Sequence, residues 1–349
     1  MANSTIIQQV TDPVYILSAE VVSPQVSFEQ MSEAPLNYTG DQLSCVEPDY
    51  MQYVDAKLIR RMSRIIKMGV AAASEALAHA GVQSPDAIIT GTAYGCLADT
   101  DQFLTRLVEF KETLLSPTAF IQSTHNTVAA QIALMLKCHN YNNTYVHKGA
   151  SFEAALTDAI SLLEEGDAQN VLVGAADEIT EKSHAILKRF GLYKRAGESL
   201  QLPQGNSKGT MAGDGASFFV VSKDPQNAQA QLTGFTNHYK SVEPPVTIID
   251  TFLREKGIAL ADIDLVITGN NGDLTEGKHY RELEQLFEKD KLTTFKQYCG
   301  EYPTASAFAL WMATHIIGQG HFNNKRVKQL LVYNNYLLSY PTLYLLKAC

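Results

Sequence analysis

The chain has 349 residues, of which 45% are hydrophobic and 19% charged, a composition typical of a globular protein. Its formal net charge of −9 argues against general binding of nucleic acid. The sequence contains no apolar run of about 18 residues and no basic leader at its N-terminus, so we expect a cytoplasmic protein without a membrane span. The 5 cysteines show no CxxC spacing, which favours reduced thiols, and we predict neither a metal site nor a cofactor.

Hydrophobic patterns predict strands that alternate with helices along the whole chain. Strands are expected at 14–21, 87–90, 143–146, 170–174, 216–222, 231–235, 264–268, 329–333 and 342–346. Helices are expected at 58–80, 100–113, 123–136, 151–165, 182–190, 246–256, 276–288 and 302–317, with long connections at 23–50 and 192–213. The alternation indicates an α/β fold with mixed or parallel sheets. The pattern restarts after about residue 225, which predicts two related halves, 1–225 and 226–349.

The stretch 143–160 predicts a strand that ends abruptly and leads directly into a helix. Its first residues are strand formers, and Gly149 permits a sharp turn of the backbone. Ser151 is expected to cap the helix. Such an elbow suits a nucleophile, because the helix dipole stabilises a thiolate or an oxyanion. Here, however, the tip of the elbow is Gly149, which has no side chain.

The order of the segments resembles the β-ketoacyl synthase branch of the thiolase superfamily over nearly the whole chain. Four stretches carry the resemblance: 60–66, 117–126, 166–178 and 211–216. It implies a thiolase-like α/β fold, in which two related halves place mixed sheets among helices, and it implies dimers that form by joining sheets. Helix 123–136 and strand 143–146 match the family's dimer region, where Ile121, Val128 and Ile132 are expected to add exposed apolar surface.

Active members of this family condense acyl chains with a Cys nucleophile and two His residues that stabilise an oxyanion. Counted from either side, the family's spacing places the nucleophile at Gly149. Asn271 stands in the position of the first His. Lys296 is kept, but Glu301 replaces the second His. The resemblance therefore implies that the condensing activity is lost.

The glycine-rich loop of the family falls at 336–340, where this chain has no glycine. The resemblance also places Thr124 and His125 beside the acyl tunnel or the dimer seam. Ser151, with His147 as its base, is a candidate displaced nucleophile, although the helix cap is the preferred interpretation. Cys299 is a candidate reactive thiol beside Glu301, although a buried structural thiol is more common.

Lys57, Arg60 and Arg61 form, with Arg64, a basic cluster in an acidic protein. One interpretation is a solvated helix face, as is usual for clustered charges. The other follows from the resemblance, because the first three residues fall where ketoacyl synthases dock acyl carrier protein. Carrier proteins are acidic, so a local positive patch would steer them. Both interpretations stay open.

The leading hypothesis is a synthase-like subunit that does not condense by itself and that resembles the chain-length-factor partners of active synthases. Within that group it looks most like the proteins of aryl-polyene and flexirubin-type pathways. The expected partners are acyl carrier protein and a complete β-ketoacyl synthase. Two alternatives remain open: an acyltransferase with an atypical site at Cys299, Glu301 and Asn271, and a homodimeric module that binds acyl chains.

Overall fold

A computed structural model describes residues 13–36, 40–113, 115, 117–195 and 207–349. Ten strands form one mixed sheet in the order β10-β9-β13-β14-β8-β1-β7-β5-β3-β4. The strands from the first part of the chain are β1 (Val14–Val22), β3 (Ala87–Gly91), β4 (Tyr141–Tyr145), β5 (Asn170–Asp177) and β7 (Gly215–Ser222). Those that follow are β8 (Ala230–Asn237), β9 (Leu265–Thr268), β10 (Leu292–Thr294), β13 (Gln329–Tyr336) and β14 (Tyr340–Lys347).

The two sets of five strands have the same topology. In the first set, β3 lies between β4 and β5 and pairs in parallel with both, while β5 pairs with β7, and β7 with β1, antiparallel. In the second set, β9 lies between β10 and β13 and pairs in parallel with both, while β13 pairs with β14, and β14 with β8, antiparallel. β1 joins the sets, because it pairs with β7 over most of its length and with β8 through Val14–Ile16. The repeated order shows that the chain is built from two related units of mixed sheet.

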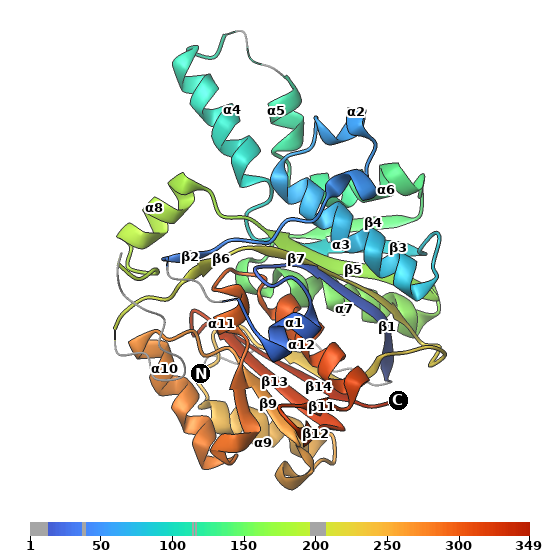
Figure 1. The fold of residues 1–349 in the computed structure, drawn as a ribbon, viewed down its shortest axis with the longest axis vertical. Coiled ribbons are helices and arrows are strands. Elements are labelled where there is room, and N and C mark those ends of the chain that lie inside the picture. The colour runs from blue at the N-terminus through green and yellow to red at the C-terminus, as the bar shows by residue number, and fades with distance from the viewer. Residues whose placement is uncertain (1–12, 37–39, 114, 116, 196–206) are drawn as a thin grey trace.

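Helices lie on both sides of each set of strands and between them (Figure 1). Between the two sets lie α7 (Ser151–Glu165) and α12 (Ser306–Gln319), whose apolar side chains form one core with both inner sheet faces. Eleven of the 14 residues of α12 are buried, as expected for a helix that is apolar on every side. α3 (Arg64–Ala80) and α6 (Thr127–Leu136) cover the outer face of the first set, and α9 (Pro245–Glu255) covers that of the second. This is the layered thiolase-like fold that the resemblance implied.

The remaining short elements lie in the connections. The described part of the predicted loop 23–50 contains α1 (Phe28–Glu33), β2 (Gln42–Leu43) and the start of a 3-10 turn, η1 (Tyr50–Gln52). β2 pairs with β6 (Ala212–Gly213), and β11 (His321–Phe322) pairs with β12 (Lys325–Arg326). Further helices are α8 (Glu181–Arg189), α10 (Leu274–Arg281) and α11 (Lys296–Cys299), and 3-10 turns are η3 (Leu260–Asp262), η4 (Glu282–Gln285) and η5 (Lys289–Lys291). Residues 196–206 of the predicted connection 192–213 lie outside the described residues.

The helix expected at 58–80 is in fact two helices, so that prediction was wrong at its start. α2 (Ala56–Ile59) is capped by Asp55, whose side chain accepts a hydrogen bond from the backbone N–H of Lys57. The chain then turns, buries Met62, and starts α3 at Arg64. The apolar pattern continues across the break because Met62 packs with α3 without being helical. Periodicity alone does not distinguish an apolar residue on a helix face from one buried in a turn.

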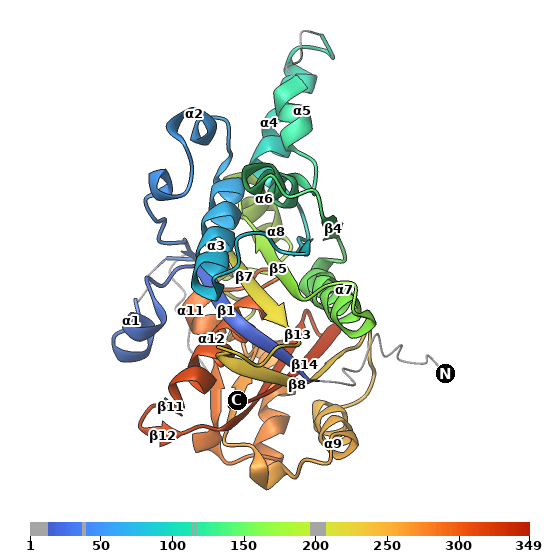
Figure 2. The ribbon, with the colours of Figure 1, turned by 90° about the vertical axis from the view of Figure 1, so that its right-hand side faces the viewer.

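The helix expected at 100–113 begins earlier, as α4 (Leu97–Glu109), and is followed by α5 (Pro117–Gln122). Figures 1 and 2 show α4 and α5 projecting together from the body of the molecule as an arm. The ring centroids of Phe103 and Phe120 lie 5.3 Å apart and join the two helices. Elsewhere on the arm, Leu104, Val108 and Ile121 are more than half exposed.

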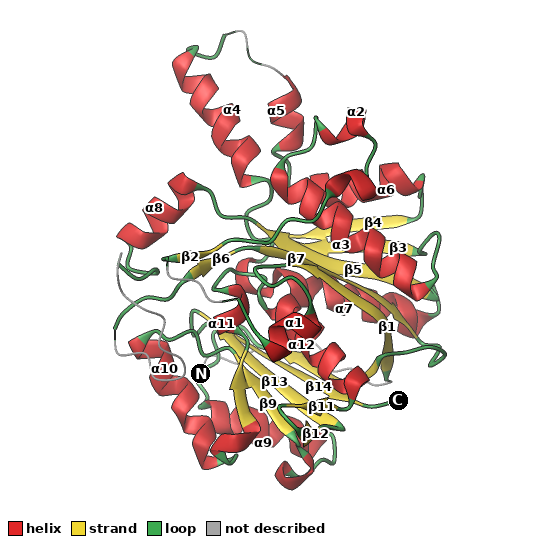
Figure 3. Cartoon of the chain, in the orientation of Figure 1, coloured by secondary structure: helices red, strands yellow, loops and turns green. Residues whose placement is uncertain are grey.

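β4 is an edge strand, as predicted (Figure 3). The expectation for its apolar surroundings was wrong in part, because Val128 and Ile132 are buried under α3 in the outer core. Ile121 is exposed, and so are Leu134 on α6 and Tyr141 on β4. No helix in the part of the chain that the structure describes is long and apolar enough to cross a membrane.

Candidate functional site

The elbow between β4 and α7 contains a single turn of 3-10 helix, η2 (Lys148–Ala150), with Gly149 buried at its centre. A Cβ atom placed on Gly149 would lie 2.9 Å from both Cβ and Cγ of Tyr336, and closer still to its Cδ1. Tyr336 is the last residue of β13 and is buried. Its ring therefore occupies the space into which a side chain at position 149 would project. Sequence reasoning missed this residue, although it noted that glycines were absent at 336–340.

Ser151 is fully buried, and its hydroxyl is used within the elbow. Oγ accepts a hydrogen bond from the backbone N–H of His147 at 2.8 Å and donates one to the carbonyl of Lys148 at 2.8 Å. The helix cap is Ala150, and Ser151 is the first residue of α7, so the expected capping role was wrong. The contact with His147 is through the backbone and not the ring, and it gives Ser151 no base.

The structure brings together Asn271, Glu301 and Lys296, which the resemblance placed at the oxyanion site. The Nδ2 atom of Asn271 lies 2.7 Å from Oε2 of Glu301 and 3.0 Å from Oε2 of Glu276, and it donates to both. Its Oδ1 accepts from the backbone N–H of Asp273 at 3.1 Å. Nζ of Lys296 lies 2.5 Å from Oε1 of Glu301, and both side chains are buried.

This arrangement leaves Asn271 with no amide hydrogen for a ligand, because carboxyl groups accept both. Burial, with the nearby charges of Glu301 and Asp273, raises the pKa of Glu276 to about 8. Glu276 is therefore mostly protonated at neutral pH, while Lys296 and Glu301 form a buried ion pair. The amide hydrogens of Asn271 and the ammonium group of Lys296 are thus used within the network, and the carboxylate of Glu301 would repel a developing negative charge.

Above this network lies a cleft of about 210 Å³. Its lining comes from several distant loops and includes Tyr193, Asn271, Glu276, Glu301 and Tyr336. Glu276 was not singled out in the sequence, although it lies close to Asn271 along the chain. Tyr336 both lines the cleft and covers Gly149, so the elbow is separated from the cleft by an aromatic ring.

Cys299 is fully buried in the core between the two sets of strands. Burial raises the pKa of its thiol far above the usual range, which disfavours the nucleophilic thiolate. Its sulfur contacts the carbonyl oxygen of Gly300 at 3.3 Å. This environment is that of a structural thiol and provides no support for the reactive interpretation.

Thr124 and His125 lie in the turn between α5 and α6, and both are exposed. The hydroxyl of Thr124 donates to the carbonyl of Ile121 at 3.0 Å. A Cβ atom on Gly95 would meet the His125 ring at 3.0 Å, so this ring packs on the start of the α4 arm. The two residues therefore lie at the surface beside the base of the arm.

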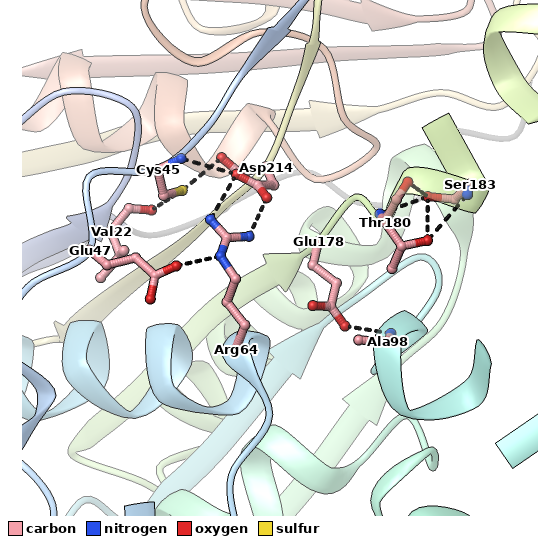
Figure 4. A network of polar contacts seen from close by, with 9 residues as sticks. All are labelled: Val22, Cys45, Glu47, Arg64, Ala98, Glu178, Thr180, Ser183 and Asp214. Atoms are coloured by element: carbon pink, nitrogen blue, oxygen red, sulfur yellow. Dashed lines mark hydrogen bonds and ion pairs between the residues drawn. The ribbon is translucent and has the colours of Figure 1, made fainter. Parts of the chain in front are cut away.

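Lys57, Arg60 and Arg61 are exposed around the α2–α3 break. Arg64 differs, because its guanidinium pairs with Glu47 at 2.6 Å and with the buried carboxylate of Asp214 (Figure 4). Arg64 thus ties α3 to the chain between β6 and β7 and is structural. The other three cations project into solvent and remain candidates for docking a partner.

A buried acid that the sequence did not suggest connects the two halves. Asp177 ends β5 and accepts hydrogen bonds from Thr92 at 3.0 Å and from Thr304 at 2.8 Å. Burial raises its pKa, and these hydrogen bonds oppose that effect. The only sequence signal was an acid at the end of an apolar strand. Among the described residues, no group of three or more His, Cys, Asp and Glu side chains is arranged to hold a metal ion.

Residues 17–227 match the family described as β-ketoacyl synthase, N-terminal domain. This match covers more than half of the chain, which therefore belongs to the β-ketoacyl synthase family. A search of curated proteins finds no match for the sequence.

Solved structures of ketosynthases share the fold at low sequence identity. The ishigamide ketosynthase/chain length factor superposes with a TM-score of 0.80 at 16% identity, covering 97% of this chain and 99% of that one. The ketosynthase ApeO in complex with its chain length factor ApeC from Xenorhabdus doucetiae gives 0.75 at 14%, covering 97% and 98%. AntDE:AntF, a type II polyketide synthase acyl-carrier protein in complex with its ketosynthase, gives 0.74 at 13%, covering 97% and 100%.

Proposed function

We propose that this chain is a non-condensing subunit of ketosynthase fold that acts as a chain-length-factor-like partner of a complete β-ketoacyl synthase. The observation that carries the proposal is the contact between Gly149 and Tyr336. The position of the family's nucleophile has no side chain, and the space for one is filled by a buried ring. Covalent catalysis needs a nucleophilic atom with room for the acyl group, and this elbow provides neither.

The oxyanion site supports the same proposal independently. Asn271 gives both of its amide hydrogens to carboxyl groups, and Glu301 is held by Lys296. A developing negative charge beside Glu301 would be repelled. Loss of the nucleophile and loss of the oxyanion donors together make an isolated catalytic role unfavourable, including the atypical site around the buried Cys299.

The surface around β4 supports pairing with a second ketosynthase fold. Within the described part of the chain β4 forms one edge of the sheet, and such an edge favours pairing with a strand of another chain. β4 and the residue after it expose Tyr141 and Val146, α6 beside β4 exposes Leu134, and α5 on the arm exposes Phe120 and Ile121. The arm of α4 and α5 adds further apolar surface that a monomer leaves in water. ApeO is described in complex with its chain length factor. By analogy with that pair, we take a catalytically complete synthase as the best partner.

Acyl carrier protein is the second proposed partner. Lys57, Arg60 and Arg61 are exposed on one side of the molecule in a protein of net charge −9. AntDE is described in complex with an acyl-carrier protein. An exposed positive patch steers an acidic partner even when the whole protein is acidic. The pathway, of aryl-polyene or flexirubin type, is part of the same hypothesis and rests on the resemblance alone.

Coexpression with the synthase encoded beside this chain tests the proposal. Native mass spectrometry should show a one-to-one heterodimer, and the synthase should give products of a different length when this chain is present. Replacing Ile121 and Leu134 with Asp should reduce heterodimer formation. Val242→Asp is the matched control, because Val242 is 83% exposed and lies in the loop before α9.

Two outcomes would contradict the proposal. Exclusive homodimers with no influence on product length would favour the acyl-binding module. A stable acyl adduct on the protein alone, mapped by peptide mass spectrometry to Ser151 or Cys299, would favour the enzyme with an atypical site.

A further inference from the structure

Glu153, on the first turn of α7, is a buried acid that the proposed function does not use, and it is only 1% exposed. Its Oε1 atom accepts hydrogen bonds from Oη of Tyr344 at 3.0 Å and from Oγ1 of Thr342 at 3.2 Å, both on β14. Thr342 in turn accepts a hydrogen bond from Nδ2 of Asn237 on β8 at 3.1 Å. The carboxyl group of Glu153 therefore joins a helix of the first half to two strands of the second half.

The surroundings of Glu153 favour a neutral carboxylic acid over a carboxylate. Its hydrogen-bond donors are hydroxyl groups, and no basic side chain in the described part of the chain pairs with it. Tyr344 on β14 is the titratable group that faces it, Ser306 on α12 carries no charge, and β3, β5 and β7 place apolar side chains against α7. The next acid along α7, Asp158, is bonded at the surface to Tyr141. A lone carboxylate in such a core is strongly unfavourable, so the proton is retained.

Burial is the largest influence on the pKa of Glu153 and raises it, while the neighbouring hydroxyl and backbone groups lower it by less. Oε2 of Glu153 and Oγ of Ser306, the first residue of α12, are both buried. Among the described residues, neither atom has a hydrogen-bond partner. Ser306 lies close enough to affect the pKa of the carboxyl group. A protonated Oε2 can donate to this hydroxyl and so fasten α7 to α12 as well as to β14.

The contacts of Glu153 connect the two parts that meet at the closed elbow. Gly149 precedes Glu153 by about one helical turn. Thr342 pairs with Asn334 on β13, shortly before Tyr336 at the end of the same strand. The hydrogen bond between Glu153 and Thr342 therefore fixes the turn that carries Gly149 relative to the hairpin that carries Tyr336.

We infer that Glu153 is a proton-dependent latch, which as a neutral acid fastens α7 to β14 and keeps Tyr336 packed against Gly149, and which loosens this joint when it loses its proton. A carboxylate at this place would have to be hydrated, and hydration requires α7 and β14 to separate. Every group in the latch belongs to this chain, so the inference does not depend on the proposed pairing with a synthase. It adds control of the closed elbow by a residue that lies outside the elbow itself.

The latch predicts that protection of the elbow falls as pH rises. The unfolded chain loses the proton of Glu153 near pH 4.5, whereas burial keeps this proton on the folded chain to higher pH. Between these two values the folded state binds more protons than the unfolded state, so this group lowers stability as pH rises. Above the folded-state pKa the carboxyl group is ionised and the joint opens.

Hydrogen exchange followed by mass spectrometry at pH 6 and pH 9 tests the latch, after correction for the intrinsic exchange rate at each pH. In the wild-type protein, the protection of residues 147–156 should fall roughly tenfold or more between the two values. Glu153→Gln does not titrate and its amide can still accept and donate, so its protection should fall by less than about twofold. Glu165→Gln is the control, because Glu165 is exposed at the end of the same helix and this variant should behave as the wild type.

Glu153→Met is a second variant, because an unbranched apolar side chain suits this core and also removes the titration. An equal loss of protection in the wild type and in either of the two Glu153 variants would overturn the inference. Unchanged protection of the wild type between pH 6 and pH 9 would overturn it even if both variants failed to fold. A failure to form heterodimers would leave these results unchanged and would affect the proposed function alone.

Discussion

The ring of Tyr336 lies where a side chain at position 149 would project, so Gly149 and Tyr336 are complementary in size. Gly149 alone explains the missing nucleophile, and Tyr336 alone explains why the space beside the elbow is filled. Together the two residues make this packing stable. A glycine at 149 allows the ring to pack on the backbone of the elbow, and the ring removes the void that a glycine leaves.

Gly149→Cys should therefore destabilise the protein, by about 1–3 kcal/mol, because the new Cβ atom overlaps the Tyr336 side chain. Gly149 does not have a left-handed backbone, so the expected cost is steric. Tyr336→Gly should be destabilising alone, because it leaves a cavity. The double variant should be more stable than the sum of the two effects predicts, as measured by urea denaturation.

The same double variant should still fail to condense, because Asn271 and Glu301 remain in place of oxyanion donors. The measurement is decarboxylation of malonyl-carrier thioester and release of ketoacyl product. Condensation at the rate of an ordinary synthase would show that the oxyanion site lies elsewhere.

The buried ion pair of Lys296 and Glu301 should affect the stability of the fold. Lys296→Met should destabilise the fold by about 3–5 kcal/mol, because Glu301 would be left buried without its cation. Lys296→Met combined with Glu301→Gln should recover much of this loss. Chemical denaturation of both variants at pH 7 tests the pair, and an equal loss in both would indicate a packing effect instead.

Glu276 should make stability depend on pH. Its pKa is about 8 in the folded protein and near 4.5 in the unfolded chain. Between these values the unfolded chain has lost this proton while the folded chain keeps it, so this group lowers stability as pH rises through the window. Glu276→Gln mimics the protonated form and does not titrate. The free energy of unfolding of this variant minus that of the wild type should therefore be larger at pH 8 than at pH 4.5, by up to a few kcal/mol. Glu288→Gln, at an exposed position, is the control, and a pH-independent difference for Glu276→Gln would contradict the prediction.

Carrier docking should depend on the exposed cations. Reversal of Lys57, Arg60 and Arg61 to Glu should weaken binding of acyl carrier protein at least tenfold at low salt, with little change in stability. Wild-type binding should weaken as salt is added. A control variant reverses Lys278, Arg326 and Lys347, which are exposed in the second half and change the net charge equally. An equal loss of carrier-protein affinity in both variants would mean that binding depends on the net charge and not on the patch of Lys57, Arg60 and Arg61.

The sequence alone determined the alternation of strands and helices, the resemblance to ketoacyl synthases and the absence of a side chain at Gly149. These features are local, because hydrophobic period, turn residues and motif spacing are written along the chain. All nine predicted strands form, with ends that differ from the predicted ones by at most three residues, whereas the short strand β10 was not predicted.

Only the tertiary structure decided how the site is closed. Tyr336 meets Gly149, and Asn271 meets Glu301, across segments far apart in the chain, and no local pattern specifies such contacts. The break before Arg64 and the burial of Val128 and Ile132 were also decided by packing, because an apolar residue fits a buried turn as well as a helix face.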